Sequence, residues 1–373
     1  MSPAANGGPL VRVRLGICLA SRYTGVTALV KLWSPERGEK KCRKHVRRDR
    51  SLYVVTSPGA SALGENEDSV RLLVQPRDGL SPLVSAIRQA KKHIDVMIFR
   101  FDRGELQKEL ETAVKRGVRV RALIAHTNRG GEANLRKLEQ QLLEVGATVA
   151  RTGDEFVRYH GKFMVIDRSA LWLLGFNFTA LDLKSRSFGV VTKQKSIVQE
   201  ALKVFEADSV RQPFEPTAGA LVVSPENART LLSKFIGEAR QQLLIYDPKI
   251  GDQAMIKLLK NRVKEGLDVR VIGKVGKRAG DVPHEKYPGK RLHVRAIVRD
   301  GREAFVGSQS LRTLELEKRR EVGCIFRDAS AVAELIKTFE DDWALTDSGK
   351  KSKEKDKSET DGAESQREAR AEA

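Results

Sequence analysis

The stretch RYHGKFMVIDRSALWLLGFNF, residues 158–178, places polar groups at fixed positions in an otherwise apolar segment. His160 and Lys162 stand near its start, and Asp167 lies in its middle. Asn177 stands near its end. The apolar runs on either side of Asp167 predict a buried β-hairpin. Because one such pattern arises easily by chance, its meaning depends on whether the chain holds a second copy.

The chain contains an internal repeat. LLVQPRDGLSPLVSAIRQAKKHIDVMIF, from Leu72, aligns without gaps with LVVSPENARTLLSKFIGEARQQLLIYDP, from Leu221, at an offset of 149 residues. The match continues through KRGVRVRALI and KEGLDVRVIG. Each copy predicts a helix, a short apolar strand, a second helix that ends at Gly117 or Gly266, and another strand. This alternation predicts an α/β fold with a largely parallel sheet.

The two copies then diverge. In the first copy the repeated elements are expected at residues 83–90, 94–99, 106–114 and 118–125. They are followed by an extra predicted helix, NLRKLEQQLLEV. The second copy has a basic loop instead, KVGKRAGDVPHEKYPGK, and is shorter by sixteen residues overall.

The opening motif recurs near the end of the second copy, as RLHVRAIVRDGREAFVGSQS. The spacing from the histidine to the basic residue and to the aspartate is the same in both copies. The corresponding pairs are His160 with His293, Lys162 with Arg295, Asp167 with Asp300, Asn177 with Gln309, and Ser187 with Glu321.

Two H-x-K/R-x4-D motifs, each followed by a Gly-containing element, resemble the signature of the phospholipase D superfamily. The resemblance covers roughly residues 70–345. Phe176 stands where the family usually has Ser, and the second copy has Arg for Lys and Gln for Asn. The resemblance implies two α/β halves related by a pseudo-twofold, with one active site at their interface. It also implies cleavage or exchange of a phosphodiester through a phosphohistidine, without a metal or another cofactor.

The chemistry explains why basic and amide side chains accompany the histidines. A phosphodiester is an anion, so a nucleophile that approaches it meets charge repulsion. Lys162 and Arg295 are expected to hold the non-bridging oxygens and to stabilise charge in the transition state. Asn177 and Gln309 are expected to donate further hydrogen bonds, although Gln309 is one methylene longer.

The two imidazoles have different expected roles, because one must attack phosphorus while the other protonates the leaving alkoxide. Glu321 occupies the place where family members carry a carboxylate that bonds an imidazole. We expect that carboxylate to favour the imidazolium of His293, which makes His160 the nucleophile and His293 the general acid. Asp167 and Asp300 complete the motif, and we expect them to fix the hairpin backbone rather than to touch phosphate.

Composition and charge agree with a polyanionic partner. The chain has 373 residues with a formal net charge of +19, and residues 1–50 carry 12 Lys or Arg against 3 Asp or Glu. The segment KKCRKHVRRDR, residues 40–50, is expected to dock on an anionic membrane surface or to follow a nucleic-acid backbone. A solvated basic face is the alternative.

Four segments are predicted along the chain. Residues 1–65 read as a basic extension that is loosely packed or partly disordered, and 348–373 as a disordered charged tail. Residues 66–215 and 216–347 form the first and second halves of the repeat. Three cysteines without metal-ligand spacing suggest free thiols, and no apolar run reaches the ~20 residues that span a bilayer. We therefore expect a cytoplasmic protein or one that is peripheral to a membrane, of unspecified oligomeric state.

Three functions remain open from the sequence. The first is a phospholipase D-like enzyme that hydrolyses or exchanges a phospholipid head group. The second is a metal-independent nuclease of the same superfamily, since the residues that touch phosphorus serve both substrates. The third is a non-catalytic binding protein, which the altered second motif suggests and the retention of both histidines opposes.

Overall fold

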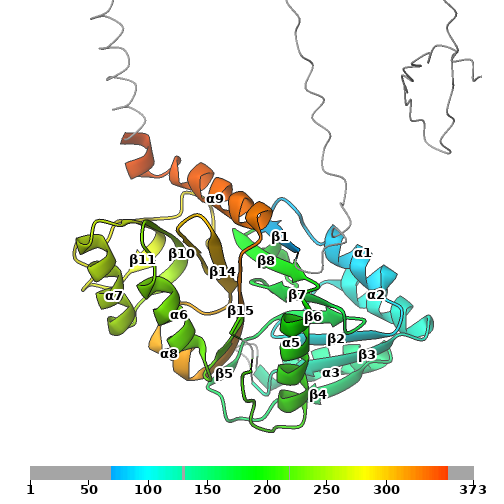
Figure 1. Ribbon diagram of the computed structural model, residues 1–373. Helices are drawn as coiled ribbons and strands as arrows, with labels where there is room; N and C mark the ends of the chain where they lie inside the picture. Colours follow the sequence, from blue (N-terminus) through cyan, green and yellow to red (C-terminus); the bar gives the residue numbers. More distant parts are fainter. Residues whose placement is uncertain (1–68, 128–130, 218, 352–373) are drawn as a thin grey trace, which may run out of the picture. The chain divides into compact units, whose positions relative to one another are not determined.

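The structure is a computed structural model that describes residues 69–127, 131–217 and 219–351 (Figure 1). The predicted basic extension, residues 1–65, lies outside the described residues, and so does most of the predicted tail. Residues 348–351, at the start of that tail, are helical. No helix within the described ranges has the length and apolar character needed to cross a bilayer.

The first half is built on a seven-stranded sheet in the order β1-β8-β7-β6-β2-β3-β4. Its strands are β1 (Val70–Gln75), β2 (His93–Ile98), β3 (Arg119–Ile124), β4 (Thr148–Arg151), β6 (Phe163–Ile166), β7 (Ala170–Leu174) and β8 (Ser187–Thr192). Its helices are α1 (Ser81–Gln89), α2 (Gly104–Lys115), α3 (Gly131–Glu144), α4 (Ala180–Leu183) and α5 (Lys195–Ser209). The elements predicted from the sequence, including the β6–β7 hairpin, are confirmed.

The second half repeats this arrangement. Its strands are β9 (Leu221–Ser224), β10 (Gln242–Ile250), β11 (Asp268–Val275), β12 (His284–Glu285), β13 (Ala296–Arg299), β14 (Glu303–Gly307) and β15 (Arg319–Phe326). Its helices are α6 (Ala228–Gly237), α7 (Gln253–Lys264), α8 (Thr313–Glu317) and α9 (Ala329–Trp343). The path β9-β15-β14-β13-β10-β11-β12 matches the first sheet strand for strand. Helix α3 has no counterpart among the described elements of the second half.

The expectation of a largely parallel sheet was wrong. Strands β2, β3 and β4 run parallel, but β2–β6, β6–β7, β7–β8 and β8–β1 are antiparallel pairs. The reason is the motif itself, because the chain turns back there through a tight hairpin. A helical crossover, which parallel neighbours need, is absent between β6 and β7.

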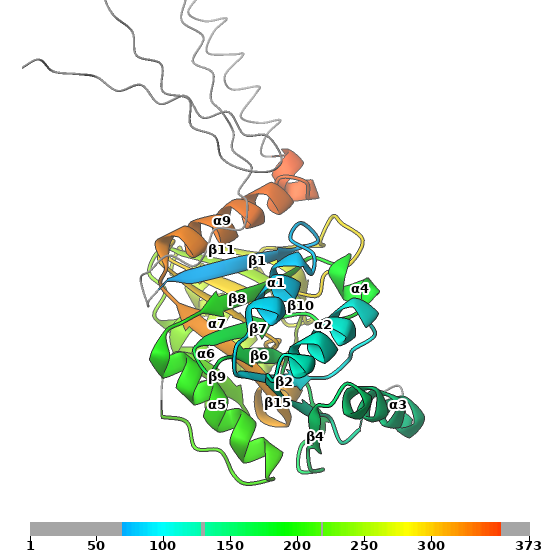
Figure 2. The same cartoon turned by 90° about the vertical axis from the view of Figure 1, so that its right-hand side faces the viewer.

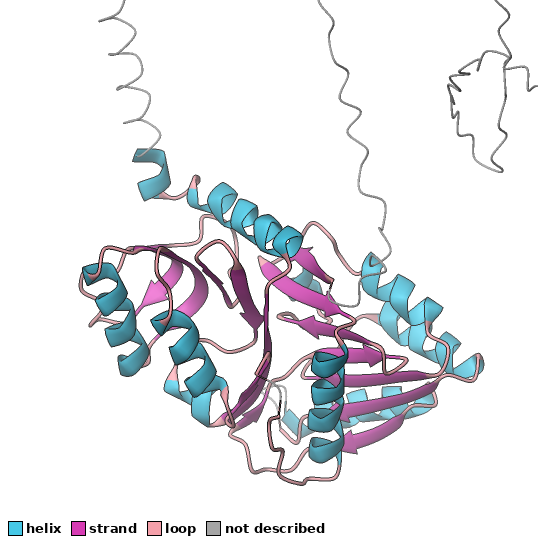
Figure 3. Cartoon of the chain, in the orientation of Figure 1, coloured by secondary structure: helices cyan, strands magenta, loops and turns pink. Residues whose placement is uncertain are grey.

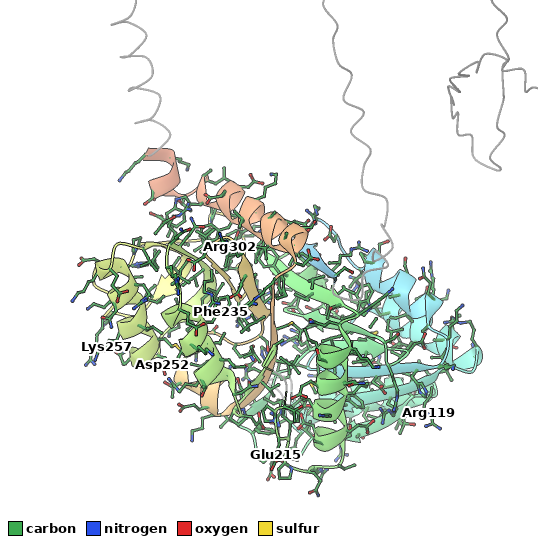
Figure 4. The ribbon with its side chains drawn as sticks, viewed as in Figure 1. Arg119, Glu215, Phe235, Asp252, Lys257 and Arg302 are labelled. Carbon is green, nitrogen blue, oxygen red and sulfur yellow. The ribbon has the colours of Figure 1, made fainter. Side chains whose placement is uncertain are left out.

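Three apolar clusters hold the layers together. One packs α1 and α2 against the outer face of the first sheet, and another packs α6 and α7 against the second sheet. The third cluster lies between the halves and includes residues of both sheets, of α5 and of α9. Figure 2 shows α9 alongside β1, and Figure 3 colours the same helices and strands by type. Local signals fix the helix ends, as where Asp252 caps α7 by accepting from the backbone N–H groups of Ala254 and Met255 (Figure 4).

A buried arginine on β15 ties the second half to the first. The backbone carbonyl of Arg320 accepts the His160 N–H at 2.8 Å, and its Nη2 donates to Asp208 Oδ1 on α5 at 3.0 Å. Arg320 is 1% exposed, and Tyr159, which pairs with it between β15 and β5 (Arg158–Tyr159), donates its hydroxyl to the same aspartate. The strand that precedes His160 is therefore fixed to the other half by backbone and side chain together.

Arg186, in the first half, makes the equivalent contacts to the second half. The carbonyl of Arg186 accepts the His293 N–H at 3.0 Å, and an isolated bridge joins Arg186 to Leu292. Its guanidinium donates twice to Asp342 on α9, at 2.8 Å each. We call Arg186 and Arg320 the strap arginines. Each holds the backbone of the histidine in the opposite half.

Removal of a strap partner is expected to destabilise the protein strongly. Asp342→Ala leaves the Arg186 guanidinium without its carboxylate, and breaking a buried ion pair from one side costs about 3–5 kcal/mol. The neighbouring Asp341 is a matched control, because it pairs on the surface with Lys337, where both side chains are well exposed. Its replacement by alanine is expected to cost about 0.5 kcal/mol or less. Urea unfolding of both variants tests this, and equal losses would contradict the role of the straps.

Candidate active site

Both motif histidines line one pocket of about 370 Å³, together with Asn177 and Arg295. His160 comes from the first half and His293 from the second, so the predicted site at the interface is assembled from both halves. The His160 residue is 8% exposed. Close packing fixes its backbone, because a Cβ on the following Gly161 would lie 2.7 Å from the Met97 sulfur.

Glu321 contacts His160, and the expectation that it stands beside His293 was wrong. Its Oε2 lies 2.8 Å from His160 Nδ1, and the side chain is fully buried on β15. The strap geometry gives the reason. Because the Arg320 carbonyl holds the His160 backbone, the adjacent residue on β15 reaches the imidazole of the opposite half.

Asp182 is the carboxylate nearest His293, and the motif pattern does not predict it. Its Oδ1 lies 3.3 Å from His293 Nδ1 and accepts from Arg291, while its Oδ2 accepts from Asn177 Nδ2 at 2.7 Å. Burial alone would raise the pKa of this carboxyl, but His293, Arg291 and Asn177 together hold it well below its usual range. A signal existed in the repeat, since the structurally equivalent position on α8 is also acidic, Glu315.

The two motif cations occupy different depths. Lys162 is 1% exposed, and its Nζ donates to the His160 carbonyl at 2.6 Å. Burial lowers the pKa of this amine to about 7, against the opposing effect of Glu321. Arg295 lines the pocket, where its Nε donates to Ser310 Oγ at 3.1 Å. Its buried Nη1 has no hydrogen-bond partner within the described part of the chain, so one donor of the fork remains for a ligand.

Burial keeps both imidazoles neutral in the free site. It lowers the pKa of His160 to about 4, although the Glu321 carboxylate acts in the opposite direction. Burial, and then the charge of Arg295, hold the pKa of His293 well below its ordinary value despite Asp182. A carboxylate partner alone was expected to favour the imidazolium, and here desolvation outweighs it. A negative charge in the pocket is therefore needed to favour protonation.

Five of the nine predicted site residues do not line the pocket: Lys162 and Glu321, whose buried contacts are given above, and Gln309, Asp167 and Asp300. Gln309 turns into the protein, where its Nε2 donates to the Val222 carbonyl at 2.9 Å. The extra methylene places its amide against this backbone, so the expectation that it donates to phosphate is not met. Asp167 and Asp300 stand at hairpin turns with φ of 51° and 52°. They accept backbone N–H groups of Lys91, Lys92 and His93, and of Arg240, Gln241 and Gln242, respectively.

The pocket is rich in guanidinium groups. Six arginines line it, namely Arg100, Arg158, Arg291, Arg295, Arg312 and Arg319. Three carboxylates line it as well, namely Asp102, Asp182 and Glu315. The excess of positive charge suits a phosphate ligand, because the guanidinium fork matches phosphate oxygens.

Comparisons with known proteins agree with this arrangement. The family model described as "Cardiolipin synthase, PLD-like domain" matches residues 83–209 and 232–343. The major cardiolipin synthase ClsA of Bacillus subtilis (strain 168) is 24% identical over 344 residues, which cover 75% of this chain and 70% of the synthase. The 5'-3' exonuclease PLD4 of Mus musculus is 31% identical over 123 residues, which cover 33% of this chain and only 23% of the exonuclease.

A solved structure shares the fold. The polyphosphate kinase of Porphyromonas gingivalis superposes with a TM-score of 0.62 at 18% identity, over 76% of this chain and 52% of the kinase. Identity this low indicates a shared fold alone. The family match is the stronger finding, because it takes in well over half of the residues and both halves of the repeat. The chain therefore belongs to the phospholipase D-like family that is described as cardiolipin synthase, PLD-like domain.

Proposed function

We propose that the protein is a phospholipase D-like phosphodiesterase or phosphatidyltransferase that acts on a phospholipid. The observation that carries the proposal is the pair of imidazoles facing one pocket, each with a carboxylate near its Nδ1. Arg295 lines this pocket, and the buried amine of Lys162 lies behind the His160 backbone within electrostatic reach of Arg295 and Asp182, so both halves contribute a cation to the field at a bound phosphate.

His160 is the proposed nucleophile. When its Nδ1–H donates to Glu321, the lone pair of Nε2 is free to attack phosphorus. The N–P bond forms as the P–O bond to the leaving alkoxide breaks, and His293 gives its proton to that alkoxide. Water or a second alcohol then transfers its proton to His293 and attacks phosphorus, which releases His160. The anionic substrate itself favours the imidazolium of His293, because a neighbouring negative charge raises an imidazole pKa.

The choice of lipid rests on the relatives. The cardiolipin synthase matches along 75% of this chain, whereas the exonuclease matches along 33%. A nuclease is the second candidate, which the arginine-rich pocket and the exonuclease both favour. A non-catalytic role is the third, because Arg295 replaces the usual Lys and the Gln309 amide is engaged elsewhere.

Lipid turnover without metal is the first prediction of this proposal. Mixed phospholipid vesicles with EDTA and a primary alcohol are expected to yield phosphatidic acid or the phosphatidyl-alcohol, measured by mass spectrometry. His160→Ala and His293→Ala should each lower kcat by about 100-fold or more, because each removes a group that acts in the transition state. His284→Ala is the matched control, since His284 is exposed on β12 and outside the pocket.

Assays with lipid and with nucleic acid distinguish the three candidate functions. Cleavage of DNA or RNA but of no lipid would replace the lipid assignment by the nuclease. Absence of turnover on both substrate classes would leave a phosphate-binding protein. Turnover that both histidine variants retain would contradict the proposed site.

The roles of the two histidines are separately testable. We expect rapid quenching with 32P-labelled substrate to trap an acid-labile phosphoenzyme whose label maps to His160. His293→Ala should slow leaving-group departure and still label His160 when the leaving group is an activated p-nitrophenolate, which needs no protonation. Label on His293 in the unmodified protein would reverse the assignment.

Anion binding should bring a proton into the site. The pKa of Lys162 is about 7 in the free protein, so the amine is largely neutral at pH 8 and a nearby phosphate raises that pKa. Calorimetric titration with inorganic phosphate at pH 8, in buffers of different ionisation enthalpy, is expected to show net proton uptake. The uptake should shrink towards pH 6, where Lys162 is already charged. It should fall in Lys162→Met and persist in Lys257→Met, an exposed lysine on α7 (Figure 4). Equal uptake in both variants would refute this account of Lys162.

A further inference from the structure

A second hollow of about 340 Å³ adjoins the histidine pocket. The two share four lining residues, namely Phe99, Arg100, Asp102 and Thr179. The opposite wall of the hollow is one side of α3, which contributes Lys137 and Gln141 among others. We call this space the α3 hollow. Because they share these four lining residues, the two spaces lie side by side.

The α3 hollow exists on one side of the pseudo-twofold. Helix α3 belongs to the segment that lengthens the first copy of the repeat, and the described second half has no equivalent helix. Every other helix of the first half has a counterpart at the same place in the element order of the second half. Helix α3 connects the parallel strands β3 and β4 and buries Leu138 and Leu142 in the apolar cluster of the first sheet, and another part of its surface lines this hollow.

Two cations of the α3 hollow have no partner in the described ranges. Arg291, in the histidine pocket, binds Asp182, and Arg319 binds Glu315. In contrast, no side-chain hydrogen bond or ion pair joins Arg100 or Lys137 to a described residue.

The charge of the α3 hollow fits one phosphodiester. Asp102 is the carboxylate that lines it, so two cations and one carboxylate leave a single positive charge. The amide of Gln141 adds a neutral donor and acceptor. An external anion with one charge and several oxygens satisfies this set.

We propose that the α3 hollow binds a second phosphate of the substrate, beside the phosphodiester that His160 attacks. The inference rests on the proposed function, because it names what the same substrate carries next to its reacting group. The second phosphate has two possible sources, a phospholipid with two phosphodiesters or the next link of a nucleic acid. The recognition chemistry is the same for both, namely Arg100 and Lys137 on the phosphate oxygens.

Substrates with one and two phosphates test the proposal in the full chain. The lipid pair is phosphatidylglycerol and cardiolipin, and the nucleotide pair is the p-nitrophenyl ester of thymidylate and that of its dinucleotide. Lys137→Ala is expected to raise KM for the two-phosphate member of a pair about tenfold and to change the one-phosphate member less than about twofold. Lys108→Ala, an exposed lysine on α2 outside both pockets, is the matched control and should change neither.

The substrate pair that responds to Lys137→Ala identifies the source of the second phosphate. An effect confined to the lipid pair assigns a lipid phosphate, and one confined to the nucleotide pair assigns a nucleic-acid phosphate. Equal changes for one and two phosphates, or no change at all, would overturn the proposal.

A binding measurement keeps the test independent of catalysis. Glycerol 1,3-bisphosphate should bind more tightly than glycerol 1-phosphate, and Lys137→Ala should abolish most of that difference. If no substrate is turned over but this difference in affinity is present, the proposed function is wrong and the assignment of a second phosphate site to the α3 hollow is supported. If both probes bind equally, the α3 hollow fails whatever the activity.

Discussion

The reciprocal contact between each strap arginine and the opposite half is the constraint on which the site depends. Arg320 holds the backbone of His160, and Arg186 holds that of His293. The Arg320 guanidinium is fully buried against Asp208 and that of Arg186 is half-buried against the buried Asp342, where an unpaired charge would be costly. Each arginine contacts the other half through both its backbone carbonyl and its guanidinium. Each histidine is therefore positioned partly by residues of the opposite half.

Desolvation sets the electrostatics of the same place. The imidazoles and the Lys162 amine are buried, so each favours its neutral form until an anion arrives. Glu321 holds the His160 ring by a hydrogen bond and Asp182 lies 3.3 Å from the His293 ring, but burial outweighs the effect of both carboxylates on the imidazole pKa values. The imidazoles and the Lys162 amine therefore gain positive charge when an anion binds. The arginines around the pocket add guanidinium donors. A phosphodiester meets donors that are fixed in advance, which reduces reorganisation during the reaction.

The sequence predicts most of the fold, because the spacing of apolar residues indicates the local structure and both halves have the same spacing. It also predicts which histidines meet, since two motifs at matching places imply one interface. It does not predict which carboxylate faces which ring. That depends on how the halves meet in space, where β15 brings Glu321 to His160 and α4 brings Asp182 near His293, and the motif spacing predicts neither contact. Gln309 shows the same limit, because one methylene decides whether an amide reaches the pocket or a backbone carbonyl.

The absence of an α3 counterpart in the described second half has a consequence for regiochemistry. A perfectly symmetric pair of halves would accept a phosphodiester in two opposite orientations, and either ester bond could then face the leaving-group histidine. Such degeneracy would yield mixed products from an asymmetric substrate. With α3 beside only one histidine's half, the two orientations differ in energy, and a difference of about 1.4 kcal/mol already selects one of them tenfold. Duplication within one chain is what permits this, because identical subunits cannot carry an insertion on one side alone.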